Sequence, residues 1–540
     1  MAANVRRTQL GRYAARHPAR LVVVLASLLL VLAAGVAAAD AFKGRDSGAP
    51  TGARLDAHTT PGAVHTAETR GAPSLRTPPA AICGSRGLRG PAQPPAHAKV
   101  VRSQSIARVA KSSRPGAVIW IGPGTHTLGN GKYDQVRPKD GQVFIGAPGA
   151  VIDGRKRNLY AFAGDAKNVT VSHLTITGFG RAGDNNNQGV VNHDAAPGWR
   201  VEHNTISDVA GAAVFIGNRN RVLSNCLTRN GQYGFSAYLR HGVHHVVLRH
   251  NEISFNNTDN WEKRMPGCGC SGGGKFWDTR GAKVEDNWVH DNVGPGLWAD
   301  TNNTGFLIDG NLISDNAEEG LFYEISYNAR ITHNTFVRNS WVKGQKNDDF
   351  TGAIYLSESG SDIRAGHTYG RHFVVAHNRF VNNWAGIIAW ENPDRFVGSP
   401  ANSSSGYTTL VNPRVATERA CGTPSKIHAK PYFDDCRWKV KHLRVEHNLF
   451  VFDPSRIPHC TPSADCGFQG LVSNYGSYPR WSPYQRYVVP NHITFDQDNH
   501  WRDNTYVGPW HFEIRTLGHQ VSWSTWRGHQ YRQDPGSVRR

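Results

Sequence analysis

Methionine and helical spacing are both scarce in this chain. The 540 residues include only 2 methionines against 57 glycines, and the apolar residues come in short β-branched runs rather than at the spacing of a helix. Repeats built from two helices, which need more than about 30 residues per unit, are therefore disfavoured. The length leaves room for one long solenoid or two ordinary domains, and the composition favours a turn-rich solenoid.

Nucleic-acid-binding motifs and dense basic helices are also missing, although the formal net charge is +19. Residues 1–100 hold 13 basic and 4 acidic residues, so much of the excess belongs to the N-terminal part of the chain. The remaining body is moderately basic, which suits an acidic polysaccharide or an anionic cell wall. We expect a polysaccharide or cell-wall polymer as the partner, no nucleic acid, and a monomeric protein.

One short pattern repeats along the body. VEDNWV, LIDGNLI and RITHNTF place an asparagine three residues after one apolar residue and two before another, at spacings of 24 and 23 residues. These asparagines are Asn287, Asn311 and Asn334, and further copies give Asn204, Asn225, Asn251, Asn378, Asn448 and Asn504. A period of this length predicts one coil of a parallel β-solenoid, and the longer spacings indicate insertions at turns.

The repeated asparagines predict an internal ladder. Equivalent residues of successive coils stack about 4.8 Å apart, and their amides can donate to one neighbour and accept from the next. A second asparagine follows five residues later in three coils, at Asn292, Asn316 and Asn339. We interpret all of them as structural, and the histidines that precede the first set as outward turn residues: His203, His250, His333, His377 and His447.

The N-terminus predicts export. Residues 1–20 contain five arginines and no acidic residue, and residues 21–39 are 19 uncharged, mostly apolar residues. We expect a cytoplasmic basic tail (1–20) and a transmembrane signal-anchor, with a signal peptide as the alternative for 21–39. The body would then lie outside the cytoplasm, attached to the cell membrane or secreted. Residues 40–98 are rich in Ala, Gly, Pro and Thr and predict a disordered linker.

The body, residues 99–540, opens with an amphipathic stretch at 103–113 that predicts a cap helix, followed by PGTHTL and RPKDGQVFIGAPGAVIDG. This opening and the asparagine repeats resemble the pectate-lyase-like superfamily over roughly residues 100–535. The resemblance implies an all-β, right-handed parallel β-helix of roughly 10–12 coils, with turn insertions and a C-terminal cap. It leaves the activity open, because the superfamily holds lyases, hydrolases, epimerases and non-catalytic surface proteins.

Eight cysteines suggest disulfides in an oxidising compartment. Cys421 with Cys436, and Cys460 with Cys466, are plausible bridges that would pin the long insertions. Cys268 and Cys270 lie in PGCGCSGGG. A disulfide from this segment to Cys226 is one alternative, and Cys83 would then be unpaired. A zinc site is disfavoured because no second Cys-x-x-Cys motif or histidine pair accompanies these residues.

Three successive coils align on the glycines of GKFWD, GLWAD and GLFYE, which brings the acids Asp278, Asp300 and Glu324 into register. Stacked like charges need a cation, a proton or a positive partner. In a lyase or epimerase acting on a uronate, the three acids would hold Ca²⁺, and Lys275 would be the base with Arg280 nearby. In a glycoside hydrolase, two of the carboxylates would act as acid and as base or nucleophile.

Other residues complete the candidate site. Trp298 and Tyr323 could stack on sugar rings, although core packing is the commoner role of such aromatic residues. Glu358 and Glu391 are further acids in later coils and join the predicted substrate-binding set. A non-catalytic surface protein that binds carbohydrate or mediates adhesion is the alternative to an enzyme, and the sequence does not decide which strand face is outward.

Overall fold

The structure is a computed structural model that describes residues 77–540, except 187, 347–350, 397, 401, 403–415, 462–463 and 475–477. All of these residues belong to the second of two units, Thr69–Arg540. The predicted tail (1–20), the predicted membrane segment (21–39) and most of the predicted linker lie outside them. Within the described ranges, no helix combines the length and the apolar character that a membrane span requires.

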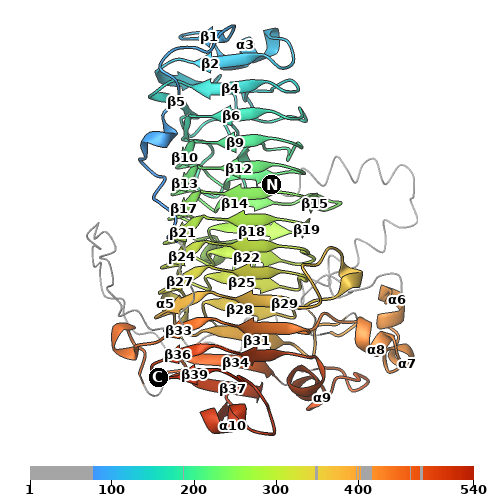
Figure 1. Cartoon of the computed structure of the whole chain (residues 1–540). Helices are drawn as coiled ribbons and strands as arrows, with labels where there is room; N and C mark the ends of the chain where they lie inside the picture. Colours follow the sequence, from blue (N-terminus) through green and yellow to red (C-terminus); the bar gives the residue numbers. More distant parts are fainter. Residues whose placement is uncertain are drawn as a thin grey trace, which may run out of the picture. The chain divides into compact units, whose positions relative to one another are not determined.

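The described residues form a stack of coils built from three long sheets (Figure 1). Sheet 1 has 13 strands: β1 (Lys99–Val101), β2 (Val118–Ile121), β4 (Val143–Gly146), β6 (Thr170–Ser172), β9 (Arg200–Glu202), β12 (Arg221–Leu223), β16 (Val247–Arg249), β20 (Lys283–Glu285), β23 (Leu307–Asp309), β26 (Arg330–Thr332), β29 (Phe373–Ala376), β32 (Leu443–Glu446) and β35 (His500–Arg502). Its strands pair in parallel throughout.

Sheet 2 also has 13 strands: β3 (Gly124–Thr127), β5 (Ala150–Asp153), β7 (Thr175–Thr177), β10 (Thr205–Ser207), β13 (Cys226–Thr228), β17 (Glu252–Ser254), β21 (Trp288–His290), β24 (Leu312–Ser314), β27 (Thr335–Val337), β30 (Arg379–Val381), β33 (Leu449–Val451), β36 (Thr505–Val507) and β39 (Val538–Arg539). Each of these two sheets has 13 strands, which is more than the roughly 10–12 coils that the sequence predicted. The extra coils lie at the two ends, where the asparagine pattern is absent or weak.

Sheet 3 has 11 strands: β8 (Gly189–Val191), β11 (Ala212–Ile216), β14 (Tyr233–Ala237), β18 (Gly274–Trp277), β22 (Leu297–Asp300), β25 (Leu321–Glu324), β28 (Ile354–Ser357), β31 (Ile387–Glu391), β34 (Phe468–Ser473), β37 (His511–Thr516) and β38 (Gln520–Val521). The β37–β38 pair is antiparallel. A separate parallel pair joins β15 (Val243–His244) and β19 (Thr279–Arg280).

The core is built from columns of apolar side chains that point into the coils. In sheet 2, Ile313, Phe336 and Phe380 occupy successive positions of one such column, and all three side chains are fully buried. The rings of Phe336 and Phe380 stack with their centroids 5.0 Å apart. The apolar residue two after each asparagine is therefore a core residue, because side chains alternate between the faces of a strand.

The predicted asparagine ladder is confirmed. Amide-to-amide hydrogen bonds of 2.8 to 3.2 Å join the asparagines in chain order: Asn204, Asn225, Asn251, Asn287, Asn311, Asn334, Asn378, Asn448 and Asn504. A parallel ladder joins the second set: Asn230, Asn256, Asn292, Asn316, Asn339 and Asn383. The two ladders lie at the two turns that flank sheet 2.

The histidines before the first ladder are turn residues, as predicted. His203, His333 and His377 have φ of 56°, 55° and 57°, in the left-handed region that lets the chain turn sharply between sheets 1 and 2. The rings of His333 and His377 stack with centroids 5.5 Å apart. The asparagine after each histidine can therefore point inward while the histidine side chain stays at the edge of the coil.

The N-terminal end is closed as predicted, by α3 (Ile106–Ser112). This helix buries Ile106 and Ala110, and the Ser105 side chain caps it by accepting from the Arg108 backbone N–H. At the opposite end lies α10 (Trp523–Arg527), whose Trp526 ring stacks on Phe512 with centroids 4.9 Å apart. Both ends of the apolar core are thereby covered, which a solenoid requires.

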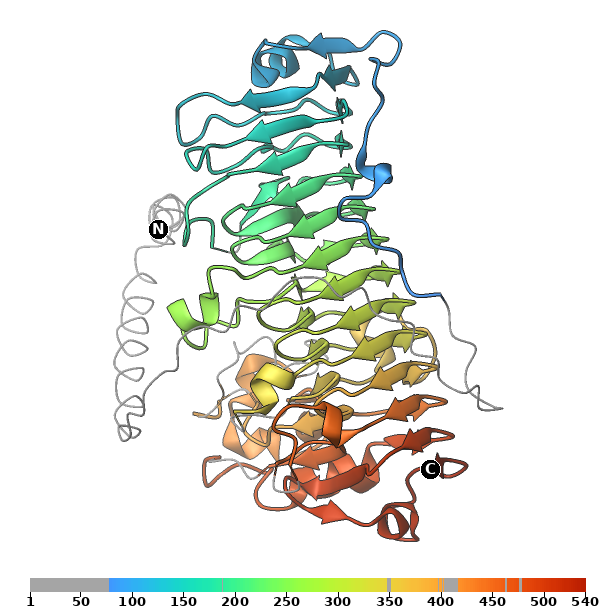
Figure 2. The same cartoon turned by 90° about the vertical axis from the view of Figure 1, so that its left-hand side faces the viewer.

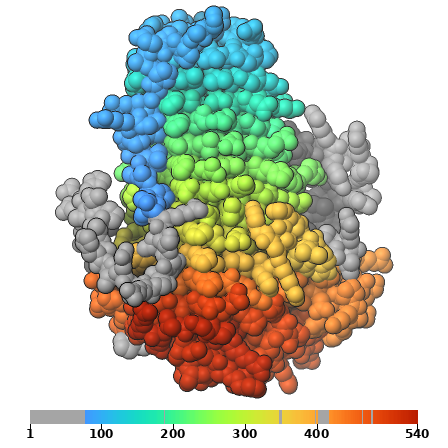
Figure 3. All heavy atoms as spheres, viewed as in Figure 1, coloured from blue at the N-terminus to red at the C-terminus, as the bar shows by residue number. Residues whose placement is uncertain are grey.

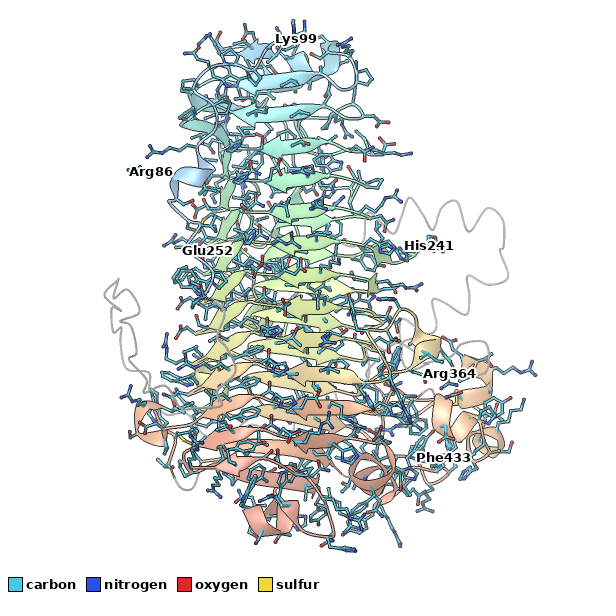
Figure 4. All side chains as sticks on the ribbon, viewed as in Figure 1. Arg86, Lys99, His241, Glu252, Arg364 and Phe433 are labelled. Carbon is cyan, nitrogen blue, oxygen red and sulfur yellow. A yellow bond between two sulfur atoms is a disulfide. The ribbon has the colours of Figure 1, made fainter. Side chains whose placement is uncertain are left out.

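The ordered body begins earlier than predicted. Residues 77–98, assigned to the linker, run along the coils from the middle of the stack to its N-terminal end (Figures 1, 2 and 3). A Cys83–Cys226 disulfide fixes this segment to β13, and the Cys83 N–H donates to Glu252 Oε2 at 2.9 Å. Figure 4 labels Glu252 beside this segment. The linker prediction failed here because low apolar content does not reveal a covalent anchor.

Insertions at the turns carry the remaining α-helices of the described residues. These are α4 (Trp261–Arg264), α5 (Trp341–Gly344), α6 (Glu418–Cys421), α7 (Pro424–Ile427), α8 (Tyr432–Asp435) and α9 (Val488–Asn491). The predicted bridges Cys421–Cys436 and Cys460–Cys466 are both present within these insertions. Figure 4 labels Arg364, which joins two insertions by pairing with Asp362 and with Asp435.

The ladder gives a first prediction. Replacing Asn311 with alanine removes its donation to Val284 O at 2.8 Å and the acceptor of the Asn287 N–H at 2.9 Å. Each buried group left unsatisfied costs about 1–3 kcal/mol, so Asn311→Ala should lower the free energy of unfolding by about 3 kcal/mol, measured by urea denaturation.

The matched control is Asn130→Ala. Asn130 is exposed and accepts one hydrogen bond from Arg155, so this change should cost less than about 0.5 kcal/mol. Equal costs at Asn130 and Asn311 would show that the ladder does not stabilise the stack.

Candidate functional site

The outward face of sheet 3 brings two columns of functional side chains together. The register pairs Lys275 with Trp298, Trp298 with Phe322, and Phe322 with Tyr355. Because side chains alternate along a strand, the residues between them face the core, as Phe276, Ala299, Tyr323 and Leu356 do. We call the first outward set, Lys275, Trp298, Phe322 and Tyr355, the aromatic column.

The aromatic column is a continuous stack. The Trp298 and Phe322 rings lie 5.0 Å apart, and Phe322 and Tyr355 lie 4.9 Å apart, measured between centroids. Lys275 Nζ stands 3.9 Å from the centroid of the Trp298 ring. Trp298 keeps only 9% of its surface exposed, and its contact with substrate stays a prediction. Because the rings stack on one another along the coils, their faces are covered by neighbouring side chains and only ring edges are turned outward.

A second outward set, the charged column, lies two residues further along each strand. Trp277 pairs with Asp300, and Glu324 pairs with Ser357 one coil beyond. Lys275 Nζ binds Asp300 Oδ2 at 2.7 Å, and the Thr301 hydroxyl donates to Asp300 Oδ1 at 2.6 Å. Both oxygens of Asp300 therefore have a partner, the Lys275 ammonium for one and the Thr301 hydroxyl for the other.

Glu324 is the acid whose protonation is most altered at this face. Burial raises the pKa of Glu324 from 4.5 to about 7; the Arg395 guanidinium lowers it, and the carboxylates of Asp300 and Glu358 raise it further. Trp298 Nε1 donates to Glu324 Oε2 at 3.2 Å. The side chain keeps 13% of its surface exposed, so solvent and a ligand can reach it. A glutamic acid of this kind can donate a proton near neutral pH.

Arg395 is a residue of the site that the sequence did not predict. It follows β31 in an insertion, and its Nη1 lies 2.9 Å from Glu324 Oε1 and 2.9 Å from Glu358 Oε2. Glu358 is fully buried and also accepts from the Ser357 hydroxyl at 2.6 Å. No repeat pattern points to Arg395, because it lies outside the strands. The only signal in the sequence was the segment WENPDR, in which Arg395 closely follows a strand that ends with the acidic residue Glu391.

The insertion before β18 covers Lys275. The Lys275 ammonium donates to the carbonyl oxygen of Gly269, which lies between the two cysteines of a Cys268–Cys270 disulfide. The proposed bridge from this insertion to Cys226 is thus wrong, because Cys226 pairs with Cys83 on the opposite side of the coil. The prediction of an unpaired Cys83 is wrong for the same reason.

The predicted acid trio is only partly assembled. Lys275 pairs with Trp298 rather than with Leu297, because Gly274 aligns with Leu297 and the residue equivalent to Gly296 is Gly273. Three glycines follow one another in SGGGK, and the sequence alignment chose Gly274 where the structure uses Gly273. The shift by one residue puts Trp277, rather than Asp278, in register with Asp300.

Asp278 and Arg280 therefore lie apart from the charged column. Asp278 has φ of 41° and sits in the turn after β18; its Oδ1 pairs with Arg280 Nη2 at 3.3 Å. Arg280 lies on β19 with 54% of its side chain exposed. The expected placement of both residues beside Lys275 and Asp300 is corrected, because the turn directs them away from the outward face of sheet 3.

Two predicted substrate-binding residues are structural instead. The Tyr323 side chain is fully buried, because Tyr323 is one residue out of phase with the outward Phe322 and Glu324. Glu391 is also fully buried and pairs with Arg437 Nη1 at 2.9 Å, while its other oxygen accepts from the Val440 N–H at 2.9 Å. Glu391 thus anchors the insertion to β31, whereas Glu358 reaches the site through Arg395.

The residues named for calcium do not fit that ion as a set. Asp278 is out of register, Asp300 is paired with Lys275, and Glu324 is paired with Arg395. Calcium needs six to eight converging oxygen ligands, which these three carboxylates do not supply. Calcium binding itself stays a prediction, without a ligand set among the described residues of this face.

Sequence and structure comparisons define the class of protein. A family model described as a right-handed beta helix region matches residues 188–368. Together with the three long, almost entirely parallel sheets, this match shows a right-handed parallel β-helix, which is the fold that the sequence predicted. No curated protein matches the sequence.

Several solved structures are similar at low identity. The α-1,3-glucanase catalytic unit of Streptomyces thermodiastaticus is 12% identical with a TM-score of 0.47, over 83% of this chain and 70% of that chain. The mannuronan C-5 epimerase AlgE4 A-module of Azotobacter vinelandii is 14% identical (TM-score 0.35, 53% and 86%). An alginate lyase in complex with a trisaccharide is 12% identical (TM-score 0.41, 82% and 85%). At this identity we transfer no residue role from them.

The raised pKa of Glu324 gives a second prediction. A glutamate that titrates at about 7 when folded and near 4.5 when unfolded binds more protons in the folded state between these values. Its contribution to stability is therefore full below pH 4.5 and is lost as the pH rises through about 7. Relative to Glu324→Gln, the wild-type protein should lose up to about 3 kcal/mol of stability between pH 4.5 and 8.

The measurement is urea denaturation of both proteins at a series of pH values. The other titrating groups are the same in both proteins. The difference between the two curves of stability against pH therefore reports the titration of residue 324. Stability curves that run parallel from pH 4.5 to 8 would contradict the raised pKa.

Proposed function

We propose that the protein cleaves a glycosidic bond of a polysaccharide on the outward face of sheet 3, with Glu324 as the proton donor. The observation that carries the proposal is a partly exposed glutamic acid with a pKa of about 7, hydrogen-bonded to a tryptophan of an aromatic stack and one coil away from Asp300. Glycoside hydrolysis uses a pair of carboxyl groups, one of which protonates the oxygen of the bond that breaks.

Each residue has a distinct role in the proposed hydrolysis. Glu324 donates its proton to the glycosidic oxygen as the bond from that oxygen to the anomeric carbon breaks. Water supplies the new oxygen on the anomeric carbon, and its proton passes to the Asp300 carboxylate, so that charge balances over the step. Lys275 holds Asp300 in position through the 2.7 Å pair, and Arg395 holds Glu324 in position through the 2.9 Å contact.

The aromatic column supports a polymeric substrate. Trp298, Phe322 and Tyr355 lie on three successive coils, so their stacked rings form a row along the axis of the β-helix. A sugar chain that lies along this row can contact the outward edges of several rings at once, whereas a single sugar would reach only one. The row runs directly beside Asp300 and Glu324, and it would hold the chain against the proton donor.

A lyase or epimerase acting on a uronate is the second candidate. The observation in its favour is Lys275, a lysine on the outward face of sheet 3 beside Asp300, which would act as the base that abstracts the proton. Such an enzyme needs a neutral base and a cation for the uronate carboxylate. Both cations of this face, Lys275 and Arg395, already pair with carboxylates, so hydrolysis fits the site better.

A location outside the cytoplasm is part of the proposal. All eight cysteines of the chain are paired in disulfides, which persist in oxidising compartments and are rare in the cytoplasm. The sequence of residues 1–39 supports export to the cell surface or secretion. Polysaccharides are available in either location.

The test is an activity screen that separates the candidates by product. The protein is incubated with neutral and uronate-containing polysaccharides, with and without Ca²⁺, and both new reducing ends and the absorbance of unsaturated sugars are followed. Hydrolysis predicts reducing ends without that absorbance. Glu324→Gln should lower the rate at least about 100-fold, because general acid catalysis contributes 10²–10⁴-fold.

The matched control is Glu446→Gln. Glu446 lies on β32 of sheet 1 and pairs with Arg502 Nη2 at 2.6 Å, so its loss should leave the rate unchanged. Absorbance of unsaturated products that depends on Lys275 would favour the lyase instead. Polysaccharide binding without any product, unchanged in Glu324→Gln, would favour the non-catalytic alternative.

A further inference from the structure

A second group of ligand-type side chains lies at the C-terminal end of sheet 3. One ligand atom each from Asp465, His511 and Glu513 lies within 4.8 Å of the others. His511 and Glu513 are two residues apart on β37 and therefore project from the same face of the strand. Asp465 belongs to the insertion that precedes β34, two residues before Gly467.

The surrounding structure holds these residues in place. Asp465 is next to Cys466, which is bonded to Cys460, and the Asp465 carbonyl accepts from Trp384 Nε1 at 2.8 Å. β37 pairs with β34 over six residues, with Phe468 opposite His511 and Gly470 opposite Glu513. Gly470 has no side chain, so the neighbouring coil leaves room beside Glu513.

The group contains polar atoms that other residues do not fully use. His511 Nε2 is buried and has no hydrogen-bond partner, although Asp465 Oδ1 lies 3.8 Å away. Glu513 is 1% exposed, and its Oε2 accepts from the Gly518 N–H at 3.1 Å. Two carboxylates and one imidazole nitrogen thus face one another, and within the described residues no lysine or arginine forms an ion pair with them. Burying such a set without a positive partner is costly.

We propose that Asp465, His511 and Glu513 bind a divalent transition-metal ion of the Zn²⁺ or Mn²⁺ class. One imidazole and two carboxylates form a donor set that such ions prefer, whereas calcium and magnesium take oxygen ligands. The site is separate from the proposed reaction, because β31 and β34 lie between β28 and β37 in the sheet. Its role is structural: the ion ties the Cys460–Cys466 insertion to the last long strand of sheet 3.

The geometry needs only a small closure. Ligand atoms around a zinc ion lie about 2.0–2.2 Å from the metal, so they must come closer to one another than 4.8 Å. The Asp465 side chain is 51% exposed and can rotate toward His511 without disturbing the core. His511 and Glu513 stay on the strand, which fixes two of the ligands in advance.

The test measures metal binding directly on the untagged full-length protein after treatment with a chelator. Isothermal titration calorimetry with Zn²⁺ alone, and in a separate experiment with Mn²⁺ alone, should show one tight binding site per chain. Asp465→Asn and His511→Gln should each weaken that site at least about 100-fold, because even residues that only support a metal ligand are worth 10–100-fold. Asp465→Asn is exposed and nearly isosteric, so this variant should fold.

The matched control is His447→Gln, which removes an exposed turn histidine elsewhere on the stack and should leave the tight site intact. Anomalous diffraction at the zinc edge should place the ion within about 2.0–2.2 Å of all three ligands. Absence of a tight site for either ion, unchanged affinity in both ligand variants, or an ion located elsewhere would overturn the proposal. None of these results depends on glycosidase activity.

Discussion

The amide ladder is the interaction on which the rest of the structure depends. Each internal asparagine of the ladder hydrogen-bonds to the coils on both sides of it, as Asn311 does with Asn287 and Asn334 at 2.9 and 2.8 Å. A slip of one residue would turn the buried amide outward and an outward residue inward, because side chains alternate along a strand. The ladder therefore fixes which residues of every coil face the core. It sets the register of sheet 3 indirectly, through the short turns that follow sheet 2.

The candidate site combines this rigid stack with one contribution from an insertion. Lys275, Asp300 and Glu324 belong to three successive strands, so their spacing follows from the distance between coils. Arg395 comes from the insertion after β31 and joins Glu324 to Glu358 across two coils. Strands thus supply the reacting groups, and an insertion adjusts their charge. A β-helix can acquire different chemistry in this way, because insertions vary without disturbing the stack.

The sequence predicted the repeated part of the fold and failed where the repeat is interrupted. The asparagine spacing identified both ladders, and the amphipathic stretch at 103–113 identified the cap helix. Asp278 was placed wrongly because SGGGK offers several glycines for the alignment, and only pairing with β22 distinguishes Gly273 from Gly274. Arg395 could not be predicted, since insertions fold by long-range contacts that no local spacing encodes. Lys275, Asp300 and Glu324 remained recognisable because charged residues interrupt otherwise apolar strands.

The most direct measurement of the central claim is a crystal structure of Glu324→Gln soaked with an oligosaccharide that the wild-type protein binds. The account predicts sugar rings along Trp298, Phe322 and Tyr355, with a glycosidic oxygen within about 3.2 Å of the residue 324 side chain. A ligand bound to sheet 1 or sheet 2, or one on sheet 3 with every glycosidic oxygen far from residue 324 and Asp300, would contradict it.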